Sequence, residues 1–128
     1  MTIDIHSAEF RDRRRAHRLQ VDIPVDLILG DGTVLKVNAS NLSLDGLLFS
    51  CDDWTSKKIE HRGIQNHPLN HIQISIVANF SKQKKLYANC RIISARRESQ
   101  DSYVIGLEFI DFQKNSEANL LEYMTSLN

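Results

Sequence analysis

The sequence lacks any long apolar run. Its apolar stretches are short, such as those at 27–29, 47–49 and 76–78, and all fall far below the roughly 18 residues that cross a bilayer. No apolar run follows a positive charge near the amino terminus, so no secretory signal is visible. We therefore expect no membrane insertion, and we expect the cytoplasm to be the compartment.

An excess of charge of either sign is also missing. Sixteen basic and sixteen acidic side chains cancel, so the molecule as a whole produces no field that would concentrate nucleic acid or anionic lipid. Aromatic residues make up only 7% of the chain, which leaves few platforms for base stacking. These two features weigh against a small RNA- or DNA-binding barrel, and no nucleic acid polymer is expected as a partner. Any anion site must be local.

The chain has only two cysteines, Cys51 and Cys90. Without an export signal, reduced thiols are favoured over a disulfide. Arg91 follows Cys90, but adjacent side chains in a strand point to opposite faces, so this neighbour would not activate the thiol. Cys51 is followed by two acids, which oppose ionisation. We expect no catalytic residue, and the chain is predicted not to be an enzyme.

Three histidines stand between the middle strands, His61, His67 and His71, with Glu60 adjacent. Their spacing matches no compact zinc pattern, and a helix carrying them would contain Pro68. We predict no metal site and no cofactor. Trp54, close by, is read as a packing residue, with a place over a ligand site as the alternative.

With 128 residues, 41% of them apolar and 25% charged, the chain has the length and profile of one soluble domain. From Leu19 to Leu29 every second residue is apolar, which predicts a half-buried strand. Pro24 indicates an edge or a bulge in that strand. Gly30-Asp31-Gly32 is a turn signal. Further strands are expected at 33–43, 47–49, 72–78, 86–95 and 103–109. Residues 52–70 are expected to form a loop with at most one helical turn, and residues 96–102 a polar turn.

After Asp111 the apolar period changes from two to about 3.6 residues. This predicts a terminal helix with Ser116 as its cap and with Leu120, Leu121 and Met124 on its buried face. The expected fold is all-β with a terminal helix: a six-stranded antiparallel β-barrel plus a C-terminal α-helix. Residues 1–17 are predicted to be a flexible basic arm, and residues 18–128 a single barrel domain.

The first predicted hairpin brings two polar segments together. If its strands pair about the Gly30-Asp31-Gly32 turn, the numbers of opposed residues sum to about 62. Arg18 then faces Leu44, and Gln20 faces Leu42. The basic run at 11–18 therefore ends beside the segment at 41–46, at one end of the sheet, and this juxtaposition is a candidate site.

The side chains at that place suit an anionic purine ligand. Arginine offers a planar fork of donors that fits phosphate or a guanine edge and can stack on a base, and Arg14 and Arg18 supply it. Asn41 can donate to or accept from a base edge, and Ser43 adds a small hydroxyl. Gly46 removes a side chain where the backbone turns or a ligand approaches. These residues indicate an anion or nucleotide site.

Arg14-x-x-x-Arg18 followed by Asn41-x-Ser43-x-x-Gly46 resembles the two-part signature of PilZ domains, RxxxR and then [D/N]xSxxG. The segments PVDL at 24–27, GLLF at 46–49 and IGLEFIDF at 105–112 are similar to strands of that family, in the family's order. The resemblance covers the chain from about residue 11 to residue 112.

This resemblance implies a PilZ-type barrel that binds cyclic di-GMP. It implies that Arg14 and Arg18 hold the phosphates and guanines, that Asn41 and Ser43 bond a guanine edge, and that Gly46 allows the turn. Two further arginines, Arg13 and Arg15, are candidates for additional phosphate contacts. It also implies a receptor or adaptor that changes conformation on binding and signals to an unidentified effector protein in motility, pilus or biofilm control.

Two other interpretations compete with this one. Basic runs are often only solvated segments, but the second half of the motif makes that reading less favourable here. A PilZ-like interaction protein of the pilus or motility machinery that no longer binds the nucleotide is the alternative function. Members that do not bind tend to lack the motif arginines, and Arg14 and Arg18 are both present.

Overall fold

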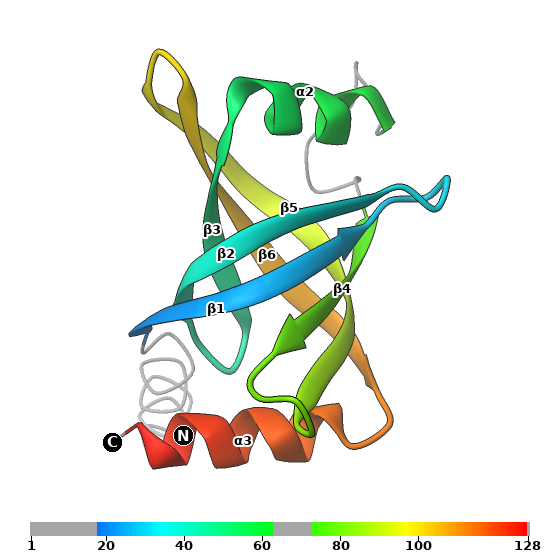
Figure 1. The fold of residues 1–128 in the computed structure, drawn as a ribbon, viewed down its shortest axis with the longest axis vertical. Helices are drawn as coiled ribbons and strands as arrows, with labels where there is room; N and C mark the ends of the chain where they lie inside the picture. The colour runs from blue at the N-terminus through cyan, green and yellow to red at the C-terminus, as the bar shows by residue number, and fades with distance from the viewer. Residues whose placement is uncertain (1–17, 63–72, 128) are drawn as a thin grey trace, which may run out of the picture.

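The computed structural model describes residues 18–62 and 73–127. Within this part of the chain, six antiparallel strands form a closed barrel in the order β1-β2-β3-β6-β5-β4, with a helix at each end (Figure 1). The strands are β1 (Leu19–Ile28), β2 (Val34–Leu42), β3 (Gly46–Asp52), β4 (Gln73–Asn79), β5 (Lys85–Ser99) and β6 (Ser102–Gln113); the helices are α2 (Asp53–Arg62) and α3 (Ser116–Ser126). The predicted six-stranded barrel with a C-terminal helix is confirmed. The predicted arm, residues 1–17, lies outside the described residues.

The core fills the barrel because alternate side chains of each strand point inward. Leu27, Phe49 and Leu107 are completely buried. Ile59 of α2 and Leu120 of α3 belong to the same apolar cluster, and the two helices lie at opposite ends of the barrel (Figure 1). Each helix therefore closes one end of the barrel with a buried aliphatic side chain, which contributes about 1.5–3 kcal/mol when removed fully from water.

Pro24 lies where β1 changes from one paired neighbour to two. It stands opposite Asn38 of β2, and the ladder between β1 and β4 begins one residue later, with Val25 opposite Ala78. Pro24 lacks an N–H to donate, so this boundary tolerates it. The predicted bulge in β1 is present, but it falls between Gln20 and Ile23 rather than at the proline.

α2 occupies ten residues that the sequence interpretation assigned mainly to a loop. The carboxylate of Asp52 accepts a hydrogen bond of 2.7 Å from the Thr55 N–H, which caps the start of the helix. Asp53 pairs with Lys57 one turn later at 3.0 Å. Among the described side chains of the helix only Ser56 and Ile59 are buried. That small buried face gives no convincing apolar period, and the prediction for this segment was wrong.

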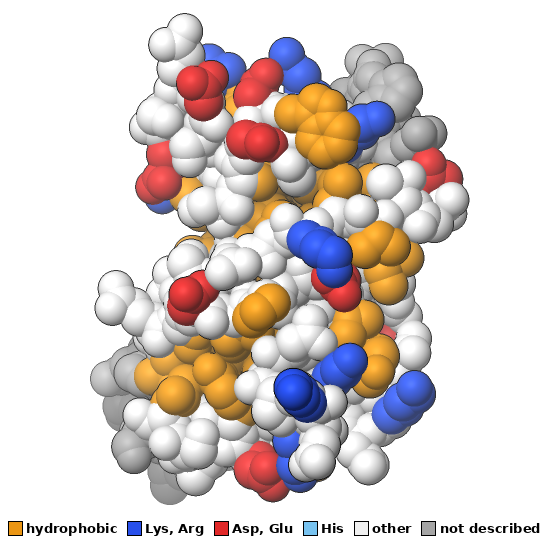
Figure 2. Space-filling model, in the orientation of Figure 1, with side chains coloured by type: hydrophobic (Ala, Val, Ile, Leu, Met, Phe, Trp, Pro, Cys, Tyr) orange, Lys and Arg blue, Asp and Glu red, His pale blue; other side chains and the backbone are white. Residues whose placement is uncertain are grey.

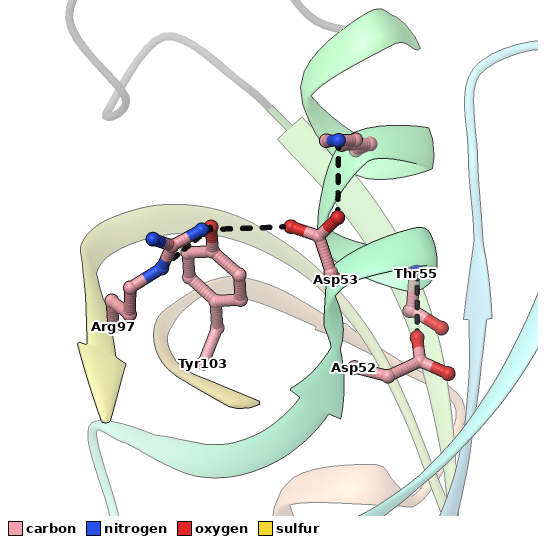
Figure 3. A network of polar contacts seen from close by, with 6 residues as sticks. Asp52, Asp53, Thr55, Arg97 and Tyr103 are labelled. Carbon is pink, nitrogen blue, oxygen red and sulfur yellow. Dashed lines mark hydrogen bonds and ion pairs between the residues drawn. The ribbon is translucent and has the colours of Figure 1, made fainter. Parts of the chain in front are cut away.

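A polar network fixes α2 against the hairpin formed by β5 and β6 (Figure 3). Arg97 of β5 lies 3.9 Å from the Asp53 carboxylate and donates to the Tyr103 hydroxyl at 2.7 Å. The guanidinium also stands 5.2 Å from the centre of the Tyr103 ring. These groups are exposed or half-exposed, so the contacts are screened by water and individually weak.

β5 and β6 continue as an extension at the end of the barrel near α2, where the last residues of β3 still pair with β6, with Cys51 opposite Tyr103 and Asp52 opposite Ser102. The predicted polar turn at 96–102 is instead mostly strand, with Arg96 opposite Val104, Arg97 opposite Tyr103 and Ser99 opposite Ser102. Beyond the end of the barrel no core remains for either face to cover. Apolar alternation stops for that reason, although the backbone hydrogen bonds between the strands continue. The polar composition of residues 96–102 therefore resembles that of a turn, and the prediction of a turn was wrong for most of this segment.

α3 begins where it was predicted, but Ser116 does not cap it. Asn115 occupies the cap position without a side-chain hydrogen bond, while the buried Ser116 hydroxyl accepts the Tyr87 N–H at 2.7 Å and ties the helix to β5. Leu120 and Met124 are buried as expected, whereas Leu121 is 48% exposed, which corrects the predicted buried face. No helix in the described segments is both long and apolar enough to cross a bilayer.

Candidate functional site

The start of β1 and the end of β2 are neighbours in the sheet. Leu19 stands opposite Leu42, and Gln20 stands opposite Asn41. Arg18 directly precedes Leu19 and is exposed, so it lies beside the β2–β3 corner (residues 41–46). The fold-back predicted from the sequence is present for the described end of the arginine segment. Arg13, Arg14 and Arg15 lie outside the described residues.

The register at this corner differs from the predicted one by a single residue. The predicted sum of 62 holds from Ile23 opposite Ala39 to Ile28 opposite Val34, but the bulge in β1 changes it to 61 at Gln20. Gln20 therefore faces Asn41 and not Leu42. The sequence contains no turn-like signal for this bulge, so counting from the hairpin turn could not reveal it. Gln20 is exposed, and it joins Asn41 on the same face as a candidate that sequence reasoning missed.

A second bulge places Asn41 on the outside of the barrel. In the pairing of β2 with β3, Ala39 faces Phe49 and Asn41 faces Leu48, so Ser40 is an extra residue. Ala39 and Leu42 are both buried, while Asn41 between them is half-exposed. Strict alternation from Ala39 would have turned Asn41 into the core. The bulge instead re-aims its amide outward, a common use of bulges near functional sites.

The outer face next to Asn41 carries little side-chain bulk. Asn41 stands opposite Leu48, and Leu48 stands opposite Gly106 of β6, so one row runs across four strands from Gln20 to Gly106. Directly opposed residues share a face of the sheet. Leu48 is half-buried, and Gly106 has no side chain. The row thus combines amide groups with a flat apolar surface.

Ser43 shapes the corner from inside. Its side chain is only 1% exposed. The hydroxyl accepts the N–H groups of Asp45 at 3.1 Å and of Gly46 at 3.2 Å, and it lies 3.3 Å from the Gly46 carbonyl, to which it donates. The Ser43 N–H also donates to that carbonyl at 2.9 Å. The hydrogen-bonding capacity of this hydroxyl is thereby used within the turn.

Gly46 is required by the close approach of β3 to β6. A Cβ atom at this position would stand 1.9 Å from the Leu107 carbonyl oxygen and 3.1 Å from the Glu108 Cα. Both are backbone atoms, which cannot move aside like the end of a flexible side chain. The Phe109 N–H donates to the Asp45 carbonyl at 2.8 Å, so the corner is joined to β6 on both sides of the glycine.

The two thiols are free and show no sign of activation. Burial raises the pKa of Cys90 to about 12, with the Asp111 charge as a second cause. Burial and then the Asp52 charge raise the pKa of Cys51 to about 11. Arg91 is exposed and forms an ion pair with Glu108 across the sheet, away from the buried Cys90 side chain.

The other candidates named from the sequence lie away from the corner or outside the described residues. Trp54 is 59% exposed and belongs to α2, at the opposite end of the barrel from the β2–β3 corner (Figure 1). It neither packs in the core nor covers the candidate site. Within residues 18–59 and 73–127, no group of three potential metal ligands occurs. His67 and His71 fall in the segment that the structure does not describe.

The geometry defines a small closed barrel with an exposed, amide-bearing face beside an arginine segment. Comparison with known proteins places it in a family. The model of the PilZ domain family matches residues 12–126, so the chain belongs to the PilZ family. The match extends through α3, beyond the segments whose resemblance was visible in the sequence. No curated protein matches the chain significantly.

Several solved structures share the fold. The PilZ domain with c-di-GMP of YcgR from Escherichia coli has a TM-score of 0.62 and 16% identity, over 90% of this chain and 91% of that one. The Bacillus subtilis inhibitor of motility MotI/DgrA has a TM-score of 0.65 and 12% identity, over 90% and 50%. The Borreliella burgdorferi PlzA protein in complex with c-di-GMP has a TM-score of 0.59 and 16% identity, over 95% and 58%. The chain thus spans only about half the length of MotI/DgrA and PlzA.

Proposed function

We propose that this chain is a cytoplasmic receptor for cyclic di-GMP that passes its bound state to a protein partner, without catalysis. The observation that carries the proposal is the position of Arg18 beside the β2–β3 corner. Arg18 is the last residue of the RxxxR half of the motif, and the corner carries the NxSxxG half, so this position supports a site built from both halves. Two structures with the same fold contain c-di-GMP, which supports the choice of ligand.

In this proposal the ligand lies across the outer row from Gln20 to Gly106. Asn41, turned outward by the bulge at Ser40, bonds a guanine edge, and Leu48 offers an apolar surface to the base. Arg14 and Arg18 contact phosphates and guanines, with Arg13 and Arg15 as additional phosphate contacts. Ser43 and Gly46 contribute by fixing the corner, since one is buried in the turn and the other touches the β6 backbone.

The same charges supply a reason for a response to the ligand. Five arginines stand between residues 11 and 18, and their mutual repulsion opposes placing all of them on one face. The phosphates of the ligand offset that repulsion, so binding favours the arrangement in which the segment covers the barrel face. We propose that a partner reads this rearranged surface in motility, pilus or biofilm control, as the name of MotI/DgrA suggests for a protein of the same fold.

Titration calorimetry tests the binding claim. We expect cyclic di-GMP to bind with a dissociation constant of about 1 μM or tighter, roughly −8 kcal/mol, and cyclic di-AMP to bind far more weakly because adenine lacks the O6 acceptor. Arg14→Ala or Arg18→Ala should abolish the heat. Arg96→Ala, an exposed arginine on the β5–β6 extension, is the control and should bind like the wild type. The absence of heat with ligand at about tenfold above that range would overturn the proposal.

Hydrogen exchange tests the location and the response. Addition of ligand should slow amide exchange in peptides covering residues 11–20 and 40–48. Peptides from α2 should not change, because that helix lies at the other end of the barrel. Binding heat accompanied by protection only elsewhere would show that the ligand uses a different surface.

A further inference from the structure

A cavity lies where α3 begins, away from the arginine motif. Its volume is about 370 Å³, and it is bordered by the β4–β5 turn, the start of β5 and the connection from β6 to α3. The residues around it include Lys82, Gln83, Lys85, Tyr87, Lys114 and Asn115. That volume lies near the lower end of the range of ligand-binding pockets, about 300–1,000 Å³.

Three lysines and no acid border this cavity. Lys84 in the same turn pairs with Glu122 at 3.3 Å. Among the residues that the structure describes, no ion pair involves Lys82, Lys85 or Lys114. Figure 2 shows several basic side chains, with an acidic group beside them, on the lower part of the molecule, where the β4–β5 turn and α3 lie in Figure 1. A molecule with zero net charge therefore carries a local positive concavity.

The base of the cavity is held by hydrogen bonds. The Ser116 hydroxyl accepts the Tyr87 N–H at 2.7 Å, and the Asn119 amide donates to the Lys85 carbonyl at 2.9 Å. Lys114 has a φ of 57°, a backbone conformation that favours glycine or asparagine. Its ammonium stands 4.4 Å from the centre of the Tyr87 ring. The backbone around the cavity is thus held by hydrogen bonds, while the side chains of Lys82 and Lys114 are exposed.

We propose that this cavity is a docking site for an acidic segment of a partner protein, whose carboxylates lie among Lys82, Lys85 and Lys114. Charge complementarity identifies the partner's chemistry. Exposed lysines are flexible point charges without the fork of arginine, so they would hold a single small anion weakly. A peptide that presents several carboxylates engages all three lysines at once. This surface is separate from the nucleotide motif, and the proposal does not depend on nucleotide binding.

The test is an NMR titration of the ¹⁵N-labelled chain with acetyl-tetraglutamate amide at low salt. Affinity is fitted only from the amide signals of residues 83–87 and 114–119, because the arginine segment can also attract an acidic peptide. We expect a dissociation constant of about 1 mM or tighter, weakening as salt approaches about 0.15 M. Inorganic phosphate in a parallel titration should bind at these signals about tenfold more weakly, since it engages fewer charges.

Variants with equal charge changes locate the effect. K82Q/K114Q should weaken peptide binding at these signals about fivefold, whereas K36Q/K58Q, which removes the same charge elsewhere, and Arg18→Ala should not. Lys114→Gly relieves the positive φ, so it should fold at least as stably as the wild type and still bind less peptide. Unshifted signals, equal losses in both double variants, or phosphate binding as tight as the peptide would overturn the proposal.

Discussion

The two ends of the barrel are held together in different ways. At the β2–β3 corner the contacts are buried and involve the backbone: the Ser43 hydroxyl bonds the turn, and Gly46 lies against the β6 carbonyl. At the end occupied by α2, exposed ion pairs join Asp53 to Lys57 and Arg97. Buried groups lose their full desolvation free energy when a partner is removed, whereas exposed pairs exchange that partner for water. Of these two sets of polar contacts, those at the corner that forms part of the candidate site are therefore the more costly to remove.

Gly46→Ala should have the largest effect. The added Cβ would meet the Leu107 carbonyl oxygen at 1.9 Å, so β3 and β6 must separate, and we expect a loss of about 3 kcal/mol in the free energy of unfolding. Urea denaturation measures it. Gly30→Ala is the matched control, because nothing lies within 4 Å of its Cβ, and it should change stability by less than about 0.5 kcal/mol. Equal stability of the two variants would contradict the comparison.

Ser43→Ala should have an intermediate effect. It leaves the buried N–H of Gly46 and the half-buried N–H of Asp45 without their hydroxyl acceptor, which should cost about 1–3 kcal/mol. Ser50→Ala, on an exposed position of β3, serves as the control in the same urea titrations and should be nearly neutral. If both serine variants unfold at the same urea concentration, the hydroxyl does not hold the corner.

Asp53→Asn should have the smallest effect, and a pH-dependent one. The Lys57 ammonium first, and then the Tyr103 hydroxyl and Arg97, hold the pKa of Asp53 below its usual value. A lowered pKa means that ionised Asp53 stabilises the fold above the ordinary aspartate pKa and loses this contribution as pH falls through the lowered value.

Thermal melts at about pH 7 and about pH 3 check this expectation. The difference in Tm between the wild type and Asp53→Asn should be small at the higher pH and smaller still at the lower one. A difference that grows on acidification would show that the carboxylate does not act through these ion pairs. The effect of Asp53→Asn on stability, compared with that of Gly46→Ala, then measures how unequally the contacts at the two ends stabilise the barrel.

Sequence reasoning was most accurate where one face of a strand is buried. The alternation from Leu19 to Leu29 predicted both the strand and its inward face, because every second side chain of a half-buried strand points into the core. It was least accurate for α2 and for the β5–β6 extension. Among the described side chains, α2 buries Ser56 and Ile59 and residues 96–101 of the extension bury none. Capping by Asp52 and the Asp53–Lys57 pair were local signs of the helix.

For the candidate site, the sequence predicted that the arginine segment meets the corner, and the described part confirms it at Arg18. It did not predict which residues face each other there. The bulges at Ser40 and before Ile23 moved the register by one residue and added Gln20 to the face that Asn41 occupies. A bulge depends on how three strands fit side by side, so no single strand's pattern records it.

The sequence by itself determined the barrel, its strand order along the chain and the two halves of the PilZ motif, because periodic burial and residue chemistry are local properties. Only the tertiary structure decided the roles inside the motif. Ser43 and Gly46 face the turn and the β6 backbone, while Asn41 faces outward. The physical reason is that these roles depend on distances between strands far apart in the chain, and those distances exist only after the barrel closes.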